Sequence, residues 1–278
     1  MEARTPSRTA LGVMAHRAIH QLFDASPKIL DDPIAPSLLA ESERTALIAR
    51  PAWIDEPRSR QLRARLVVRS RFAEDRLADA VARGIDQYVV LGAGYDSFAY
   101  RQPQWARELH IIEVDHPATQ AEKRARLAGV ATPGNLTFAP IDFEATSLAE
   151  GLRASPLDFG RPAFFSCLGV LVYLTAEAAD AVFQLVAGFP EDSELAFSFS
   201  QSGDSDIAER AGAAGEPWLT HFKRADVARR LTELGFAQID FLTPVEAGRI
   251  YFPRPRSDGL ENPSRTFLAA AIVGPNRE

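Results

Sequence analysis

The sequence predicts an α/β fold, a doubly wound and mostly parallel sheet of seven strands with a helical N-terminal extension. Three observations support this prediction. Short apolar runs alternate with helical segments from residue 86 to the end of the chain. The first of these runs stops at a glycine, which is typical of a ligand-binding turn at the carboxyl end of a strand. The residues before it space their apolar side chains as a helix does.

The same pattern predicts the domain organisation. Residues 1–85 are expected to form the helical extension, with a role as a lid. Residues 86–278 are expected to form the Rossmann-like core, because no compositional break interrupts the alternation of strands and helices. Substrate-covering insertions are expected around 201–225 and 244–265.

Within the extension, apolar residues recur three or four positions apart in the segment 7–24, which predicts a first helix. Two prolines interrupt the segment 31–40. A long arginine-rich helix is predicted over 58–83. Gly84 is expected to end it, because glycine readily adopts the left-handed conformation that closes many helices.

Within the core, each predicted strand is a short apolar run and each predicted helix begins near a capping residue or a proline. The expected strands are 88–91, 109–114, 136–141, 163–167, 194–200, 236–242 and 266–273. The helices expected between them are 117–127, 175–188 and 224–234.

Composition excludes several classes of protein. The 278 residues are 46% hydrophobic and 24% charged, and a net charge of −6 without a basic block argues against nucleic-acid binding. Cys167 is the only cysteine, so a disulfide within the chain and a cysteine-based zinc site are excluded. His16 and His20 alone do not predict a metal site. No membrane span and no secretion signal are recognised, so a cytoplasmic location is expected.

The glycine break reads VVLGAGYDSFAYR. Gly92, Ala93 and Gly94 follow the first strand, where glycine permits a tight turn and a close approach of ligand to backbone. Asp115 ends the second strand, 23 residues after Gly92. That spacing suits a carboxylate that accepts hydrogen bonds from a ribose diol. The pattern therefore favours a cofactor that contains a nucleoside, against the alternative of a plain strand-to-helix turn.

The identity of the cofactor follows from what the turn lacks. A dinucleotide fingerprint has a third glycine where this chain has Ser97, and no Gly-Lys-Ser/Thr phosphate loop is present. The carboxylate of Asp96 would repel a pyrophosphate but would tolerate a cationic ligand. S-adenosyl-L-methionine, with its sulfonium and ammonium groups, fits best, and NAD is disfavoured.

Four stretches carry a resemblance to a known family: VVLGAGYDSFAYR, IIEVDHPATQAEKRARL, APIDFEATSL and FFSCLGVLVYLT. Together they resemble the leucine carboxyl methyltransferase family, and its bacterial branch of S-adenosylmethionine-dependent O-methyltransferases most closely. The resemblance implies a class I methyltransferase fold and methylation of a small-molecule carboxylate or phenolic hydroxyl, in secondary, polyketide-type metabolism. Cofactor binding without transfer and methylation of a protein's C-terminal carboxylate stay as alternatives.

The resemblance also implies roles for single residues at the methionine end of the cofactor. An arginine before the first strand pairs with the methionine carboxylate, and VVRSRFAED offers Arg69 and Arg71, of which Arg71 is preferred. Gly92 and Gly94 flank the methionine portion. Eukaryotic relatives carry a glutamate at the position of Leu168. A leucine side chain can line the cofactor cavity but cannot accept a hydrogen bond from the ammonium group, which leaves the backbone carbonyls of Cys167 or Leu168 as alternative acceptors.

At the nucleoside end, the resemblance assigns the ribose hydroxyls to Asp115 and the adenosine to His116. Asp142 accepts from the adenine amine, with Phe143 packed against the ring. A competing interpretation makes Asp142 the N-cap of a helix over 145–152.

The catalytic residues are not defined by the sequence. A carboxylate acceptor needs no base, whereas a neutral hydroxyl needs one. Tyr173 and His221 are the candidates. Aromatic residues that could form an acceptor pocket are Trp218, Phe222, Tyr251 and Phe252, and arginines that could bind an anionic acceptor are Arg249 and Arg254. The sequence leaves the assembly state open.

Overall fold

The computed structural model describes residues 6–142, 147–201 and 205–275. In this part of the chain, seven strands form one sheet in the order β3-β2-β1-β4-β5-β7-β6. The strands are β1 (Gln87–Leu91), β2 (His110–Asp115), β3 (Leu136–Pro140), β4 (Phe164–Cys167), β5 (Glu194–Ser198), β6 (Phe236–Leu242) and β7 (Leu268–Val273). Strands β1 to β5 are parallel to one another, and β7 runs antiparallel between β5 and β6.

The helices of the extension and the core confirm most of the expected segments. The α-helices are α1 (Arg8–Phe23), α2 (Glu41–Ile48), α3 (Pro57–Ala82), α4 (Pro117–Arg126), α5 (Leu148–Arg153), α6 (Ala176–Ala187), α7 (Ser205–Ala213), α8 (Arg224–Glu233) and α9 (Pro244–Tyr251). Short 3-10 helices are η1 (Ala35–Leu38), η2 (Ala52–Asp55), η3 (Phe98–Arg101), η4 (Gln104–Ala106) and η5 (Leu171–Tyr173). The sequence analysis did not predict α7 and α9, which lie in the segments expected to be insertions.

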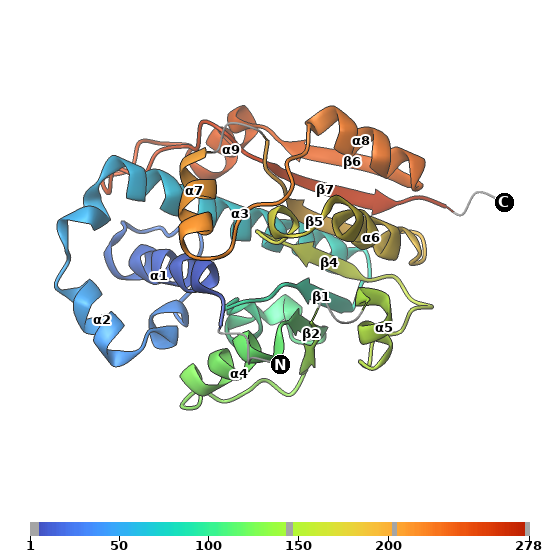
Figure 1. The fold of residues 1–278 in the computed structure, drawn as a ribbon, viewed down its shortest axis with the longest axis horizontal. Helices are drawn as coiled ribbons and strands as arrows, with labels where there is room; N and C mark the ends of the chain where they lie inside the picture. The colour runs from blue at the N-terminus through green and yellow to red at the C-terminus, as the bar shows by residue number, and fades with distance from the viewer. Residues whose placement is uncertain (1–5, 143–146, 202–204, 276–278) are drawn as a thin grey trace.

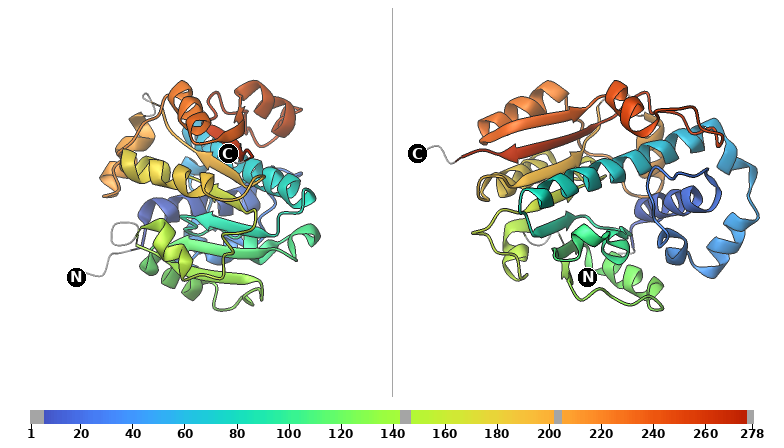
Figure 2. Two further views of the ribbon diagram at one scale, coloured as in Figure 1. Left: turned by 90° about the vertical axis from the view of Figure 1, so that its right-hand side faces the viewer. Right: turned by 180° about the vertical axis from the view of Figure 1, so that it is seen from behind.

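The side chains of β1 point alternately to the two faces of the sheet and pack into two separate apolar layers. Val89 and Leu91 of β1 point to one face, where α5, α6 and α8 cover the sheet. Tyr88 and Val90 point to the other face and pack against α3 and η3. Figure 2 shows α3 crossing that second face from one end of the sheet to the other. The predicted α/β fold is therefore confirmed, with both faces of the sheet covered by helices.

The order of the strands fixes where a ligand can bind. The chain moves from β1 outward to β3 and then returns to place β4 on the other side of β1, so the topological switch point lies between β1 and β4. Figure 1 shows α1 and α7 beyond the carboxyl ends of these two strands. The N-terminal helix thus lies over the edge of the sheet where ligands bind in folds of this kind.

The helices of the N-terminal extension pack against different parts of the molecule. Helix α3 packs on the sheet through β4, β5 and β7, whereas α1 packs mainly on η1 and α3. The division of the chain at residues 85 and 86 stays a prediction. None of the described helices is long and apolar enough to cross a membrane, and the cytoplasmic location also stays a prediction.

Candidate functional site

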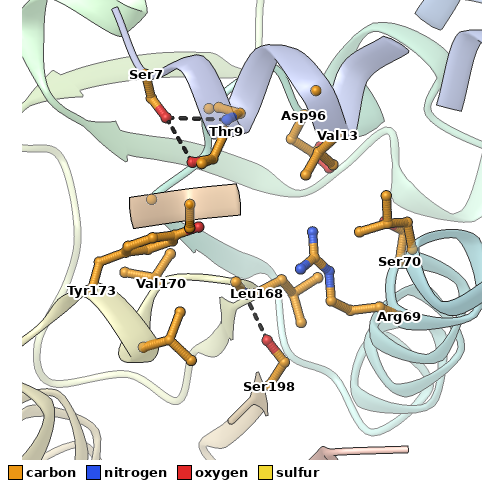
Figure 3. Close-up of a pocket in the computed structure, with 18 of the residues that line it drawn as sticks. Ser7, Thr9, Val13, Arg69, Ser70, Asp96, Leu168, Val170, Tyr173 and Ser198 are labelled. Atoms are coloured by element: carbon orange, nitrogen blue, oxygen red, sulfur yellow. Dashed lines mark hydrogen bonds between the residues drawn. The ribbon is translucent and has the colours of Figure 1, made fainter. Parts of the chain in front are cut away.

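A cavity of about 660 Å³ opens at the switch point, a volume typical of small-molecule sites. Figure 3 shows its walls, which come from α1, α3, the loop after β4 and the end of β5. Most residues proposed for the cofactor line it: Gly92, Ala93, Gly94, Asp96, Asp115, His116, Asp142 and Leu168. The cavity therefore brings together side chains that are far apart in the sequence.

The glycine turn forms the floor of the cavity. Gly92 and Gly94 have φ values of +65° and +52°, a region that favours glycine. A Cβ on Gly92 would lie 2.2 Å from Cγ2 of Val170, in the loop after β4. Glycine is required at position 92 both by its backbone conformation and by the close approach of the two loops at the switch point.

The carboxylate of Asp115 is held by the backbone. One oxygen accepts from the N–H of Gly94, and the other accepts from the N–H of His116 at 2.6 Å. Burial raises the pKa of Asp115, while these two donors act in the opposite direction. Because a carboxylate oxygen can accept more than one hydrogen bond, Asp115 can still accept from a hydroxyl in the cavity.

His116 and Asp142 form the neighbouring wall. His116 caps α4, and its Nδ1 accepts from the N–H of Ala118 at 3.2 Å, so Nε2 carries the proton of the neutral ring. Nε2 lies 3.8 Å from a carboxylate oxygen of Asp142. Asp142 does not cap the following helix, because α5 begins at Leu148 and Ser147 caps it. That competing interpretation is wrong. The proposed partner of the adenine ring, Phe143, lies outside the described residues.

Asp96 presents a partly buried carboxylate to the cavity. One oxygen accepts from the N–H of Phe98 at 2.8 Å, and the other lies 3.3 Å from a guanidinium nitrogen of Arg17. Burial alone would raise the pKa of Asp96, but Arg17, Lys123 and Arg101 outweigh burial and lower it. The group is therefore negatively charged at neutral pH.

The two candidate arginines of α3 lie on different faces of the helix. Arg71 is nearly half exposed at 46%, and its Nε donates to Asp75 at 2.7 Å. Arg69 lines the cavity, and its buried Nε has no hydrogen-bond partner in the described part of the chain. Figure 3 shows the Arg69 guanidinium pointing into the cavity. Each residue of an α-helix adds about 100° of rotation, so residues two positions apart lie on nearly opposite sides of the helix. The preference for Arg71 is therefore corrected to Arg69.

Burial lowers the pKa of Arg69 to about 10, so the guanidinium remains charged at neutral pH. A buried cation without a carboxylate partner is costly unless a ligand supplies the anion. The site therefore has a built-in preference for a negatively charged group beside Arg69.

The two catalytic candidates have different positions. Tyr173 lines the cavity, whereas the exposed side chain of His221 is not among the described residues that line it. The His221 ring lies 6.2 Å from that of Trp218. Of the aromatics predicted for the acceptor, Trp218 lines the described cavity, and Tyr251 instead donates to Asp75 at 3.0 Å.

The arginines predicted for an anionic acceptor differ from those that line the cavity. Arg249 and Arg254 are not among the described lining residues, whereas Arg65 and Arg265 are. Arg65 lies one helical turn before Arg69 on the same face of α3. A helical projection of α3 from Arg69 could have found it, whereas Arg265 carries no local signal.

Glu216 closes the cavity from the side of α7. Its carboxylate accepts from the hydroxyls of Ser7, at 2.9 Å, and Thr9, and from the backbone N–H of Arg8 at 2.6 Å. These donors form the first turn of α1, where the helix dipole also favours a negative charge. The contact joins segments 208 residues apart along the chain, and no pattern in the sequence predicted it.

Comparisons with known proteins agree with this geometry. A family model described as leucine carboxyl methyltransferase matches residues 10–187. A Bacillus subtilis protein named "Putative S-adenosyl-L-methionine-dependent methyltransferase YktD" is 31% identical over 296 residues, which cover 94% of this chain and 95% of that protein. A Mycobacterium marinum protein named "Putative S-adenosyl-L-methionine-dependent methyltransferase" is 31% identical over 274 residues, which cover 95% of this chain and 89% of that protein.

Solved structures share the fold at low sequence identity. One from Thermobifida fusca, described as a putative methyltransferase, has a TM-score of 0.61 at 17% identity and covers 98% of this chain and 96% of its own. One from Streptomyces avermitilis, a DUF574 family protein, has a TM-score of 0.59 at 15% identity and covers 95% of this chain and 97% of its own.

Proposed function

The chain belongs to the leucine carboxyl methyltransferase family and is an S-adenosyl-L-methionine-dependent methyltransferase, and we propose that its cavity holds this cofactor and directs the methyl group to an oxygen of a small acceptor. One observation carries the proposal. Among the described residues, a charged guanidinium whose Nε has no hydrogen-bond partner (Arg69) and a backbone-held carboxylate (Asp115) line the same cavity as the glycine turn. A ligand with a carboxylate at one end and a ribose at the other complements both groups.

In this proposal the nucleoside lies along the ends of β2 and β3. Asp115 accepts from the ribose hydroxyls, His116 lies beside the adenosine, and Asp142 accepts from the adenine amine. The backbone of Gly92 to Gly94 runs under the middle of the cofactor, where the absence of side chains on both glycines permits close contact.

The methionine end lies between α3 and the glycine turn. Arg69 pairs with the carboxylate, and Asp96 is the negatively charged group available to the ammonium. Leu168 lines this part of the cavity, but its side chain cannot accept a hydrogen bond. Asp96 therefore takes the place that the glutamate has in the eukaryotic relatives.

When bound, the cofactor supplies a methyl group on a positively charged sulfur, which is a good leaving group for in-line displacement by an oxygen nucleophile. The residues of the chain then have to align the acceptor and exclude water. A carboxylate acceptor arrives ionised and needs no base. For a phenol, Tyr173 lines the cavity and is the residue placed to orient the hydroxyl, whereas His221 is not placed to remove its proton.

The acceptor side of the cavity favours a small molecule. Arg65, Arg265, Tyr173 and Trp218 line it, a mixture of cations and rings that suits an aromatic or apolar acid. A role in secondary metabolism rests on the resemblance to the bacterial branch.

The test has two parts. Titration calorimetry of the full chain should show binding of S-adenosyl-L-methionine and S-adenosyl-L-homocysteine, and no heat with NAD. A tritiated methyl group should then be transferred to members of a panel of small carboxylic acids and phenols. Binding without transfer to any small molecule would favour the non-transferase alternative, transfer to a C-terminal leucine peptide would favour the protein-directed one, and no binding would refute the proposal.

A further inference from the structure

Five charged side chains form a cluster beside the glycine turn: Arg17, Asp32, Glu74, Asp96 and Arg101. Arg17, from α1, lies 2.5 Å from Asp32 and 3.3 Å from Asp96. Arg101, from η3, lies 3.3 Å from Asp32 and makes a two-point contact with Glu74. Three separate segments of the extension and two residues after β1 therefore meet in a single network of charges.

Carboxylates outnumber guanidinium groups by one among these five side chains. The two guanidinium groups of the network face three carboxylates within the described part of the chain. The charged partners of Glu74 and Asp32 belong to the network. Asp32 is fully buried and also accepts from the hydroxyl of Ser97 and the N–H of Ala35. Of the three carboxylates, Asp96 is the one among the residues that line the cavity. Asp96 is therefore the carboxylate of the network that a cationic group bound there can reach.

We propose that Arg17 is a positioning residue for the ammonium group of the cofactor, through Asp96. Its guanidinium holds one carboxylate oxygen of Asp96, donates to Ser97 at 2.7 Å and is itself fixed by Asp32. The second oxygen of Asp96 is fixed by the N–H of Phe98. The carboxylate is thus held at both oxygens, and each oxygen retains a lone pair for the ligand. This inference rests on the proposed function.

The role of Arg17 is electrostatic as well as geometric. Asp96 is faced by Arg17 from α1, Arg101 from η3 and Lys123 from α4, and it interacts with four groups across α3 and the sheet: Arg69, Glu74, Tyr88 and Glu113. Lys123 is already paired with Glu113 at 2.5 Å, and Arg101 with Glu74. Of these three cations, Arg17 is the one within hydrogen-bonding distance of Asp96, at 3.3 Å, and it contributes most to keeping this carboxylate ionised. Its loss should therefore raise the pKa of Asp96.

The experiment compares two ligands that share the nucleoside. S-adenosyl-L-homocysteine carries the ammonium and carboxylate groups, and 5′-methylthioadenosine lacks both. Calorimetry with Arg17→Gln should show a loss of affinity for S-adenosyl-L-homocysteine of about tenfold or more, as for a lost charge-assisted contact. The affinity for 5′-methylthioadenosine should stay within about twofold. Arg17→Lys keeps a cation but offers one contact point, and should lose about threefold.

The matched control is Arg63→Gln. Arg63 is an equally buried arginine that donates to both oxygens of Asp24, away from the cavity. Its substitution should leave the affinity ratio of the two ligands unchanged, whatever it does to folding. If Arg17→Gln does not fold, the comparison is made with Arg17→Lys.

The pH dependence of the affinity ratio distinguishes a positioning role of Arg17 from a general contribution of Arg17 to the stability of the fold. In the wild type the affinity ratio should be flat between about pH 5.5 and 8, because Asp96 stays ionised. In the Arg17 variants the ratio should fall as the pH decreases through the raised pKa of Asp96. A wild-type ratio in the Arg17 variants, or an equal loss for both ligands, would overturn the inference. A wild-type protein that binds neither ligand would instead refute the proposed function.

Discussion

The guanidinium of Arg69 packs directly on the backbone of Gly169, in the loop after β4. A Cβ on Gly169 would lie 2.5 Å from Nη1 and 3.2 Å from Cζ of Arg69, and φ at Gly169 is +74°. The glycine therefore leaves the space in which the arginine reaches the cavity. It also couples α3 to the switch point of the sheet.

Gly169→Ala should displace the Arg69 guanidinium from the carboxylate of the cofactor. We expect affinity for S-adenosyl-L-homocysteine to fall about tenfold while that for 5′-methylthioadenosine changes little, because the second ligand has no carboxylate. Gly235→Ala is the control, because φ there is +99° and a Cβ would meet nothing within 4 Å. Equal affinities in both alanine variants would show that the packing of Arg69 on Gly169 is irrelevant to binding.

Substitution of Arg69 itself should have a larger effect than substitution of Arg71. Arg69→Gln removes the unpaired cation and should weaken S-adenosyl-L-homocysteine binding about 10- to 100-fold, the range for a hydrogen bond between charged groups. Arg71→Gln removes an exposed pair with Asp75 and should change affinity less than about twofold. Calorimetry of the two variants side by side decides the assignment. The reverse order would restore Arg71 as the carboxylate partner.

Asp115→Asn should weaken both ligands, because both contain the ribose. The amide nitrogen would also face one of the backbone donors, Gly94 or His116, that the carboxylate accepts from. We expect a loss of about 1–3 kcal/mol of binding free energy for each ligand. A loss confined to S-adenosyl-L-homocysteine would place the ribose elsewhere.

The pH dependence of 5′-methylthioadenosine binding reports on Asp115. Burial raises the pKa of Asp115 above its usual value, and the ionised form is the stronger acceptor for ribose hydroxyls. Affinity should therefore be full above the raised pKa and should decline as the pH falls through it. In Asp115→Asn the affinity should not depend on pH over the same range, as measured by calorimetry in buffers of matched ionic strength.

Release of bound ligand should depend on Glu216. Glu216→Gln removes the charge that faces the first turn of α1 and leaves a weaker acceptor for Ser7 and Arg8. Stopped-flow displacement of S-adenosyl-L-homocysteine should give a dissociation rate constant at least about threefold higher than in the wild type. Glu177→Gln, on the exposed first turn of α6, should leave it unchanged. An unaltered rate in Glu216→Gln would mean that this contact does not limit ligand exchange.

The sheet could be predicted because each strand carries its own signal. The runs predicted as the first four strands are short and apolar. Three of these runs end at, or directly before, a glycine or an aspartate. The antiparallel position of β7 was not predicted in detail, because pairing between distant strands is a tertiary property. Two expected strands were each two residues too long. The strand expected over 194–200 ends at Ser198, and the strand expected over 266–273 begins at Leu268.

The floor of the site was predictable and its walls were not. Gly92 and Asp115 are defined by their positions at strand ends, which the sequence displays directly. The rotation of α3 is set by how it packs on the sheet, so the sequence could not decide between Arg69 and Arg71. Arg17 is one of many arginines on predicted helices, and nothing local distinguishes a buried one from an exposed one.

The structure of the complex with S-adenosyl-L-homocysteine is the measurement that tests the central claim most directly. We expect its ribose hydroxyls within hydrogen-bonding distance of Asp115, its carboxylate at the Arg69 guanidinium and its ammonium at Asp96. A ligand bound outside this cavity, or a cavity that remains empty in crystals soaked at saturating concentration, would contradict the account.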